Sequence, residues 1–146
     1  MAFEIEHKYL VTCDSYKKLA TDSFHIIQGY LSRVPERTVR VRIKNDSAYI
    51  TVKGKSEGAG RLEYEYEIPK GDALEMLELC IPPILEKIRY HVTFQGHLWE
   101  VDEFMGDREG LVIAEIELIS DEEEYPIPDF IGENVTGNPR YYNSNL

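Results

Sequence analysis

Charged and apolar residues alternate along most of this chain, and this alternation constrains the fold more than any other feature. Between residues 38 and 44, for example, Arg40, Arg42 and Lys44 alternate with aliphatic side chains. A period of two residues is typical of a β-strand, whose successive side chains point to opposite faces of a sheet. The pattern recurs in eight segments, at residues 3–11, 26–33, 38–44, 48–55, 61–68, 86–94, 97–104 and 111–119. The chain is therefore predicted to be mainly β.

Few segments favour helices. Residues 14–23 are one candidate and residues 72–79 another. The second begins with a capping box of Asp72 and Glu75, and Pro82–Pro83 stops it. Segments rich in Gly and Asn separate the strands and predict hairpin turns at residues 45–46, 54–60, 95–96 and 106–110.

The composition limits the class of protein. A chain of 146 residues with 42% hydrophobic residues can build one core, so residues 1–146 are expected to form a single domain. The charged N-terminal residues, and the lack of an apolar run of about 18 residues in the sequence, predict a soluble cytoplasmic protein. The net charge of −11 argues against nucleic acid and anionic membranes as partners. Cys13 and Cys80 form no metal-binding pattern and are predicted to be buried thiols.

The sign of the charges changes from strand to strand. Acids occupy the first strand, the 61–68 strand and the last strand, whereas bases occupy the 38–44, 48–55 and 86–94 strands. Two arrangements could accommodate this pattern: a sandwich with its charges in water, or a closed barrel with charges inward and helices covering an apolar outside. Like charges two residues apart repel each other across about 7 Å unless a counter-ligand lies between them. The recurring like-charged pairs favour the barrel.

A charged lumen of this kind would suit a metal-chelated polyanion. Carboxylate pairs bind hard divalent cations such as Mg²⁺ or Mn²⁺. Arginine presents a planar fork to phosphate oxygens, and lysine presents a point charge. Because bound divalent ions reverse the local charge, the acidic net charge does not exclude an anionic small substrate. The sequence contains no Walker motif and no Gly-x-Gly-x-x-Gly, so side chains must hold the phosphates.

Other polar and aromatic residues have more ordinary interpretations. His7 shares the apolar face of the first strand and is expected to be structural, whereas His91 and Arg61 lie on charged faces and are candidates for the lumen or its rim. Residues 120–124 are predicted to form a capped, solvated acidic turn at a helix start. Three tyrosines on the apolar faces are expected to pack against helices: Tyr64, Tyr66 and Tyr90.

The N-terminal segment from Glu4 to Lys8 matches the ExExK signature of the CYTH domain proteins, the triphosphate tunnel metalloenzymes. The resemblance continues through Gln28-Gly29-Tyr30-Leu31, Val39-Arg40-Val41-Arg42, Thr51-Val52-Lys53-Gly54-Lys55, Arg61-x-Glu63-x-Glu65, Lys87-x-Arg89-Tyr90, Trp99-Glu100-Val101-Asp102, Ala114-Glu115-x-Glu117 and Tyr141-Tyr142-Asn143-Ser144-Asn145-Leu146. The chain therefore resembles the short bacterial members of this family over nearly its whole length. The ordered set of charged pairs is a more specific signal than ExExK alone.

This resemblance implies an eight-stranded antiparallel closed barrel, or tunnel, with a charged lumen and a few helices packed outside. It implies metal-binding carboxylates at Glu4, Glu6, Glu63, Asp102, Glu115 and Glu117. It implies phosphate-binding bases at Arg40, Arg42, Lys53, Lys55, Lys87 and Arg89. Lys8 and Tyr30 would form a catalytic dyad that activates the attacking water. The chain end near Leu146 is expected to bear on the closure of one tunnel mouth.

The protonation state of Lys8 stays open at this point. Basic neighbours would favour its neutral, proton-accepting form, whereas Glu4 and Glu6 would favour its charged form unless bound metal cancels their influence.

The sequence thus predicts hydrolysis of a triphosphate that depends on Mg²⁺ or Mn²⁺. Inorganic tripolyphosphate is the favoured substrate because no segment signals a nucleobase pocket. The alternatives are hydrolysis of thiamine triphosphate or a nucleoside triphosphate, a class IV type adenylate cyclase, a non-catalytic polyphosphate-binding module, and a solvated β-sandwich with a protein-interaction role. An apolar barrel exterior with few helices is also compatible with a homodimer.

Overall fold

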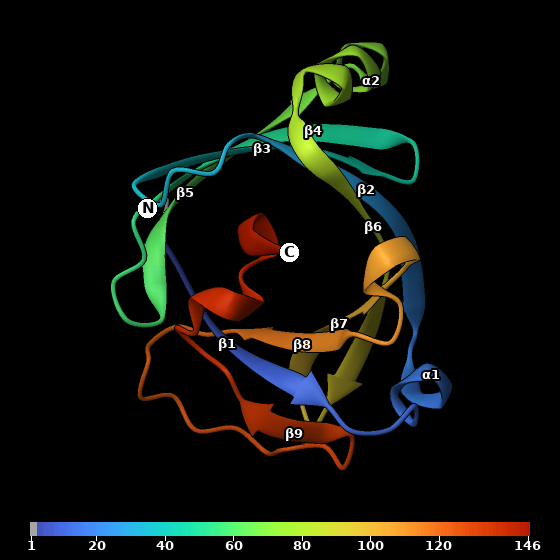
Figure 1. The fold of residues 1–146 in the computed structure, drawn as a ribbon. Helices are drawn as coiled ribbons and strands as arrows, with labels where there is room; N and C mark the ends of the chain where they lie inside the picture. Colours follow the sequence, from blue (N-terminus) through green and yellow to red (C-terminus); the bar gives the residue numbers. More distant parts are fainter. Residues whose placement is uncertain (1–2) are drawn as a thin grey trace.

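The computed structural model describes residues 3–146, and antiparallel strands make up most of it (Figure 1). The strands are β1 (Phe3–Val11), β2 (Asp22–Ser32), β3 (Arg37–Lys44), β4 (Ser47–Gly54), β5 (Gly60–Ile68), β6 (Ile81–Phe94), β7 (His97–Phe104), β8 (Val112–Glu117) and β9 (Ile131–Asn134). The helices are α1 (Tyr16–Leu19), α2 (Lys70–Leu79) and the short 3₁₀ turns η1 (Gly106–Arg108), η2 (Pro139–Tyr141) and η3 (Asn143–Asn145).

Eight of the strands close into a barrel. They follow one another in the order β5-β4-β3-β2-β6-β7-β8-β1, and β1 pairs back with β5, where Glu4 lies opposite Arg61. β9 lies outside this ring and pairs with the last part of β1, where Val11 lies opposite Ile131. Figure 1 looks into the ring. The predicted eight-stranded antiparallel closed barrel is confirmed.

The charged faces of the strands point into the barrel. Gln28 lies opposite Arg42 in the β2–β3 pair, and Arg89 lies opposite Asp102 in the β6–β7 pair. All four side chains are buried. Charges on the outer face of a sandwich would be solvated instead. The burial of these inward-facing polar side chains therefore rules out the solvated β-sandwich.

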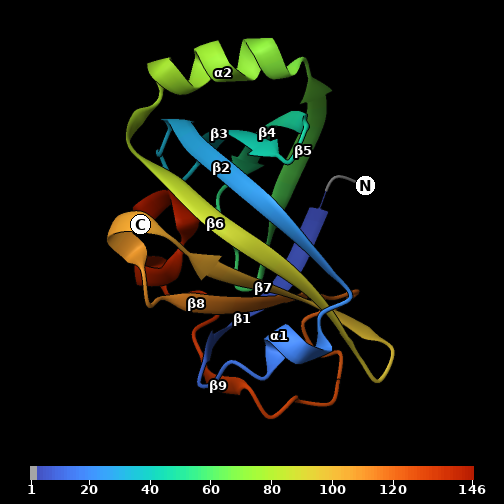
Figure 2. The same cartoon turned by 90° about the vertical axis from the view of Figure 1, so that its right-hand side faces the viewer.

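Apolar side chains from the other strand faces pack on the outside of the ring. α2 lies over β2, β3 and β4 (Figure 2), where Ala73 packs with Val41 and Ala48. A second cluster surrounds Trp99 and includes Tyr16 of α1 and the chain leading to β9. Burial of apolar surface is the main favourable contribution to folding. Because most of this burial occurs outside the ring, the middle of the lumen is left for polar groups.

The tyrosines expected to pack against helices behave in two ways. Tyr90 contacts the ring of Tyr16 in α1, with 5.4 Å between ring centroids. The prediction for Tyr64 and Tyr66 is wrong, because they are 45% and 62% exposed on β5, whereas α2 lies over β2, β3 and β4. The prediction for Cys13 is also wrong: it is exposed in the loop after β1.

Two helix predictions need correction. The first helix is only α1, because β2 begins at Asp22 and pairs with the long β6, where Asp22 lies opposite His91. The second ends at Leu79 as predicted, but it begins at Lys70 after Pro69 and has no capping side chain. Strand pairing and a proline boundary therefore decide these ends rather than the polar capping signals.

Residues 120–124 form a turn and no helix. The carboxylate of Glu123 accepts a hydrogen bond from the backbone N–H of Ile119 at 2.8 Å, and it pairs with His97 at 3.4 Å. These contacts hold the segment against β7. Cys80, by contrast with Cys13, is buried as predicted. No helix among residues 3–146 is long and apolar enough to cross a membrane.

The C-terminal residues enter one end of the barrel (Figures 1 and 2). Leu146 packs there with Leu85, Phe104 and Ile113, which continue the inward faces of β6, β7 and β8. Arg108 donates a hydrogen bond from Nε to the backbone oxygen of Leu146 at 3.0 Å. The chain end therefore narrows this opening, which we call the C-terminal mouth.

Candidate functional site

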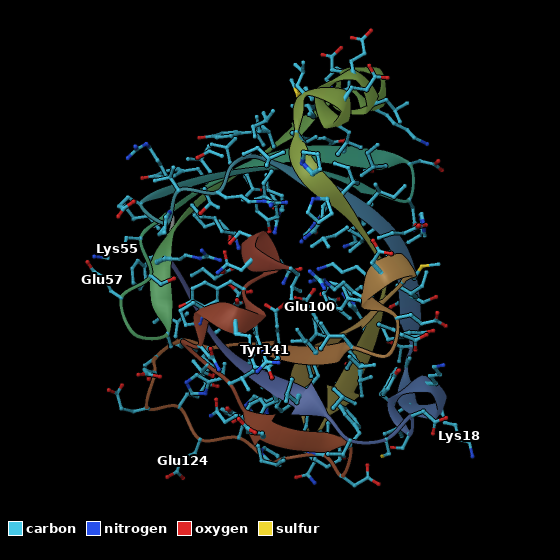
Figure 3. The ribbon with its side chains drawn as sticks, in the orientation of Figure 1. Lys18, Lys55, Glu57, Glu100, Glu124 and Tyr141 are labelled. Carbon is cyan, nitrogen blue, oxygen red and sulfur yellow. The ribbon has the colours of Figure 1, made fainter. Side chains whose placement is uncertain are left out.

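The lumen contains a cavity of about 210 Å³ whose lining side chains are all charged. We call it the central cavity. Six bases and seven acids line it: Arg40, Arg42, Lys44, Lys53, Lys87, Arg89, Glu4, Glu6, Glu63, Glu65, Glu100, Glu115 and Glu117. Figure 3 shows Glu100 pointing into the barrel. Ionised groups at this density are costly to bury unless they are paired or bind ions.

Neighbouring side chains fix the two arginines of β3. Arg40 donates from Nη2 to the hydroxyl of Thr51 at 3.1 Å and to the carboxylate of Glu65 at 3.3 Å. Arg42 donates from Nε to Oε1 of Gln28 at 3.2 Å. Burial lowers the pKa of Arg42 to about 9, and the charge of Arg40 adds to this effect. A bound anion would relieve the repulsion between the two guanidinium groups.

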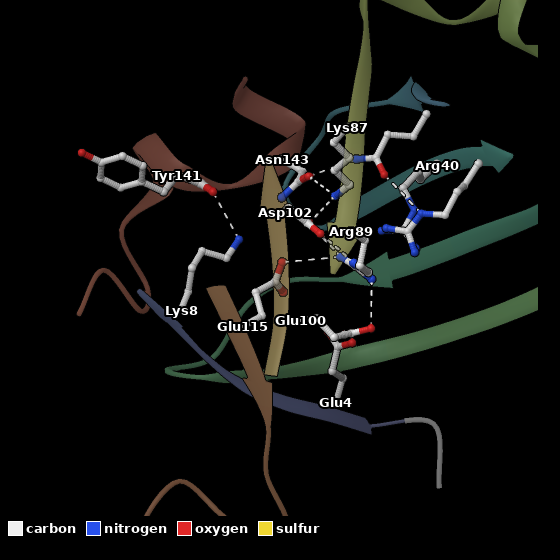
Figure 4. Close-up of polar contacts among 12 residues, drawn as sticks. Glu4, Lys8, Arg40, Lys87, Arg89, Glu100, Asp102, Glu115, Tyr141 and Asn143 are labelled. Carbon is white, nitrogen blue, oxygen red and sulfur yellow. Dashed lines mark hydrogen bonds and ion pairs between the residues drawn. The ribbon is translucent and has the colours of Figure 1, made fainter. Parts of the chain in front are cut away.

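Asp102 holds two bases of β6 in place (Figure 4). Lys87 Nζ lies 2.7 Å from one carboxylate oxygen, and Arg89 donates to both oxygens at 2.7 and 2.8 Å. Burial alone would raise the pKa of Asp102, but Arg89 and Lys87 lower it to about 2. Burial also lowers the pKa of Lys87 to about 7. Since both its oxygens are engaged, Asp102 orients Lys87 and Arg89 and is poorly placed to bind metal.

Two pairs of carboxyl groups form the acidic side of the cavity. Burial raises the pKa of Glu4 to about 7 against the opposing charge of Lys53, and a hydrogen bond with Glu63 adds to the rise. Burial, followed by the charge of Glu115, raises the pKa of Glu6 well above its ordinary value. Each pair therefore consists of carboxyl groups held too close together for both to ionise freely.

This donor set fits a hard divalent ion. Among residues 3–146, no three acidic, histidine or cysteine side chains are already arranged as a metal cluster. The two pairs nevertheless put four buried or half-buried carboxyl groups on one side of the cavity, and oxygen donors suit Mg²⁺ and Mn²⁺. The groups that would hold such an ion are Glu4, Glu6, Glu63 and Glu115, which all line the cavity. Glu117 lines the same cavity but is more exposed.

Lys8 and Tyr30 lie on different sides of the lumen. Lys8 is buried, and its Nζ donates to the backbone oxygen of Tyr141 at 3.2 Å (Figure 4). Burial alone would raise the pKa of Glu115, but the charge of Lys8, more than that of any other group, lowers this pKa to well below its ordinary value. Tyr30 is buried opposite Arg40 in the β2–β3 pair. No hydrogen bond links Lys8 to Tyr30 in the described part of the chain.

Three residues singled out from the sequence lie apart from the central cavity. Lys55 is exposed and points away from the barrel in Figure 3. Arg61 lines two other pockets near the C-terminal mouth. His91 Nε2 lies 3.2 Å from Glu100, at the edge of the cavity. His7, as expected, has a structural role outside the ring, where its Nδ1 lies 2.6 Å from the hydroxyl of Tyr125.

The structure adds polar residues that alternation could not identify. Asn143 of η3 accepts hydrogen bonds from Lys87 at 2.8 Å and from Gln28 at 3.1 Å. Gln28 lies in the matched Gln-Gly-Tyr segment, so a signal for it existed. Asn143 lies in an irregular tail, where no periodicity shows that the chain turns back into the lumen.

Comparisons with known proteins agree with this geometry. The CYTH domain model matches residues 2–142. An inorganic triphosphatase of Acetivibrio thermocellus is 55% identical over 147 residues, which cover 100% of this chain and 94% of the relative. An inorganic triphosphatase of Nitrosomonas europaea is 30% identical, with 98% of this chain and 95% of the relative covered.

Solved structures show the same fold. A crystal structure of an inorganic triphosphatase matches with a TM-score of 0.68 and 28% identity, and covers 97% of this chain and 95% of that one. A putative adenylate cyclase of Bacillus halodurans has a TM-score of 0.61 at 20% identity, with 84% of each chain covered, and shares the fold. The family match spans nearly the whole chain and includes the charged strands that line the lumen, and the chain therefore belongs to the CYTH domain family.

Proposed function

We propose that this protein hydrolyses inorganic tripolyphosphate in a reaction that depends on Mg²⁺ or Mn²⁺. One observation carries the proposal: the central cavity is lined only by charged side chains, with bases and acids from different strands. Bases bind the oxygens of a polyphosphate, and carboxyl groups bind the cation that accompanies it. The relatives named as inorganic triphosphatases, one of them 55% identical, support the same substrate.

The basic side of the cavity would grip the phosphate chain. Arg40 and Arg42 present guanidinium forks from β3, while Lys87 and Arg89 are held in place by Asp102. Because these bases are already oriented, little reorganisation is needed when charge develops on the phosphate oxygens. Lys53, half-buried beside Glu63 at 3.1 Å, would link the basic and acidic sides.

The acidic side would hold the cofactor through Glu4, Glu6, Glu63 and Glu115. A bound Mg²⁺ or Mn²⁺ supplies charge neutralisation and polarises the phosphate group. Water would attack a terminal phosphorus, and the bond to the next bridging oxygen would break to release orthophosphate and pyrophosphate.

Lys8 is the side chain proposed to take the proton of the attacking water, at Nζ. It is buried on β1 close to Glu6 and Glu115, two of the carboxyl groups proposed to hold the cation. A positioned side chain can take the proton of water as the new bond to phosphorus forms. Tyr30 would contribute from the opposite side of the lumen, next to Arg40.

The test is orthophosphate release from tripolyphosphate with Mg²⁺, with Mn²⁺ and with EDTA. Wild type, Arg42→Ala and Lys18→Ala should be compared. Arg42 lines the cavity, whereas Lys18 is exposed on α1 outside the ring. Each substitution removes one positive charge. We expect release that requires metal, falls about a hundredfold in Arg42→Ala and stays at the wild-type rate in Lys18→Ala. Tight binding without release in any metal would instead identify a polyphosphate-binding module.

A further inference from the structure

A second pocket lies at the C-terminal mouth, separate from the central cavity. Its volume is about 210 Å³, several times the roughly 30 Å³ that one water molecule occupies in the liquid. The lining residues are Arg33, Pro35, Thr38, Lys55, Ser56, Arg61, Pro139, Tyr142, Ser144 and Asn145. Three of these side chains are basic and none is acidic. We call it the mouth pocket.

Two buried polar atoms of the mouth pocket lack hydrogen-bond partners among residues 3–146. One is the hydroxyl of Thr38, a side chain that is only 3% exposed. The other is Nε of Arg33. Arg33 is held in position, because its Nη2 donates to the backbone oxygens of Ile81 and Pro83 at 3.1 and 3.2 Å. Buried polar groups in native proteins nearly always have partners, so these two donors indicate a ligand that accepts hydrogen bonds.

The mouth pocket continues the inward faces of the barrel. Thr38 precedes Arg40 by two residues on β3, so its side chain shares the face of the phosphate-binding bases. Arg61 precedes Glu63 in the same way on β5, and its guanidinium lies 6.0 Å from the centroid of the Tyr142 ring. One strand repeat of two residues spans about 7 Å.

A small pocket connects the two larger ones. It shares Ser56, Arg61 and Tyr142 with the mouth pocket and shares Glu4 and Glu6 with the central cavity. The C-terminal segment therefore fills the β6–β8 side of this mouth with Leu146 and leaves a basic pocket along β3, β4 and β5.

We propose that the mouth pocket is a second phosphate-binding site, in which Arg33, Thr38 and Arg61 bind a phosphate group outside the central cavity. The phosphate group can come from two sources with the same chemistry: free orthophosphate, or a phosphoryl group still attached to a substrate that lies in the lumen. The second source rests on the proposed function, because it requires a triphosphate in the central cavity. Phosphate suits the pocket because it accepts from arginine forks and from a hydroxyl at once. Lys55, whose side chain points outward, adds positive potential at the rim.

The test uses the metal-free full-length protein in EDTA, where no turnover occurs. Amide resonances are followed by NMR during titration with sodium orthophosphate and, separately, with tripolyphosphate. Ser56, Ser144 and Asn145 report the mouth pocket, while Glu65 and Glu100 report the central cavity. The variants are Thr38→Val, which keeps the side-chain shape, and Arg61→Gln. The matched control is Arg37→Gln, an exposed base next to Thr38 on the opposite face of β3.

We expect the mouth-pocket amides to shift with their own dissociation constant. That constant should rise about tenfold in Thr38→Val and in Arg61→Gln, the loss expected for one hydrogen bond to a charged group, and should not change in Arg37→Gln. A response to orthophosphate identifies free anion as the source, and a response to tripolyphosphate alone identifies an attached phosphoryl group. If neither ligand moves these amides, or if both variants bind as wild type does, the proposal is wrong. Hydrolysis in the central cavity would be unaffected by that result, because it is measured separately with metal present.

Discussion

Oδ1 of Asn143, near the end of the chain, lies 2.8 Å from Nζ of Lys87 in the lumen. The same oxygen accepts a hydrogen bond from Gln28, which in turn accepts one from Arg42. The C-terminal segment is therefore part of the basic side of the lumen and does more than narrow one mouth.

Asn143→Ala should raise KM for tripolyphosphate by about tenfold, because Lys87 and Gln28 lose the hydrogen-bond acceptor that orients them. Steady-state kinetics with Mg²⁺ or Mn²⁺ measure this. The comparison is Arg108→Ala, which loosens the chain end at Leu146 without touching Lys87. Equal losses in the two variants would mean that Asn143 only tethers the tail.

Lys8→Ala should lower kcat by about a hundredfold or more, as expected for loss of a general base, with a smaller change in KM. Tyr30→Phe removes only a hydroxyl from the basic side and should lower kcat as well. The kinetic split between kcat and KM, measured under saturating metal, is the readout. A Lys8→Ala enzyme with wild-type kcat would exclude Lys8 as the base.

Glu6→Gln should stabilise the metal-free protein and weaken its response to metal. In wild type, burial and the neighbouring Glu115 raise the pKa of Glu6 well above its ordinary value, so ionising Glu6 as the pH rises costs stability, whereas an amide of the same shape never ionises. A metal that binds only the folded state adds about 2.7 kcal/mol at a hundred times its dissociation constant. Thermal unfolding with and without Mn²⁺ measures both effects. A Glu6→Gln protein with the full metal-induced rise in Tm would place the metal elsewhere.

Outside the site, the hydrogen bond between Tyr16 and Glu103 is expected to make the stability of the fold depend on pH. The hydroxyl of Tyr16 donates to the carboxylate of Glu103 at 2.6 Å and lowers the pKa of that carboxyl group. A lowered carboxyl pKa stabilises the fold above the ordinary value of 4.5, and this contribution is lost as the pH falls below it. Tyr16→Phe should therefore cost about 1 kcal/mol at pH 7 and less at pH 3.

Chemical unfolding of Tyr16→Phe at several pH values measures this difference. Tyr90→Phe, which alters the ring that contacts Tyr16, is the control. A loss for Tyr16→Phe that stays constant from pH 7 to pH 3 would show that the carboxylate of Glu103 is not involved.

Strand positions were predictable where alternation is strict. β1 and β7 have the predicted bounds, because both faces of each strand carry a clear pattern. The first two residues of β2, Asp22 and Ser23, fall in the predicted helix, because they carry no strand signal and are ordered by pairing with β6. β9 was missed because four residues contain too few alternations to read.

The site was predictable in part for the same reason. Charged pairs on strands, such as Arg40 with Arg42, follow the barrel faces that the structure confirms as inward. Lys55 continues the alternation of β4, but the strand ends at Gly54, so its side chain is no longer held inward. Asp102 shares the inward face, yet only the structure shows that Lys87 and Arg89 engage its oxygens.

We infer that the protein hydrolyses inorganic tripolyphosphate in its charged lumen in preference to organic triphosphates. The most direct measurement is kcat/KM for tripolyphosphate, ATP and thiamine triphosphate under one set of metal conditions, with cyclic AMP assayed alongside orthophosphate. We predict metal-dependent orthophosphate release that is fastest from tripolyphosphate, with no cyclic AMP. A higher kcat/KM for ATP or thiamine triphosphate, or cyclic AMP as the product, would contradict the claim.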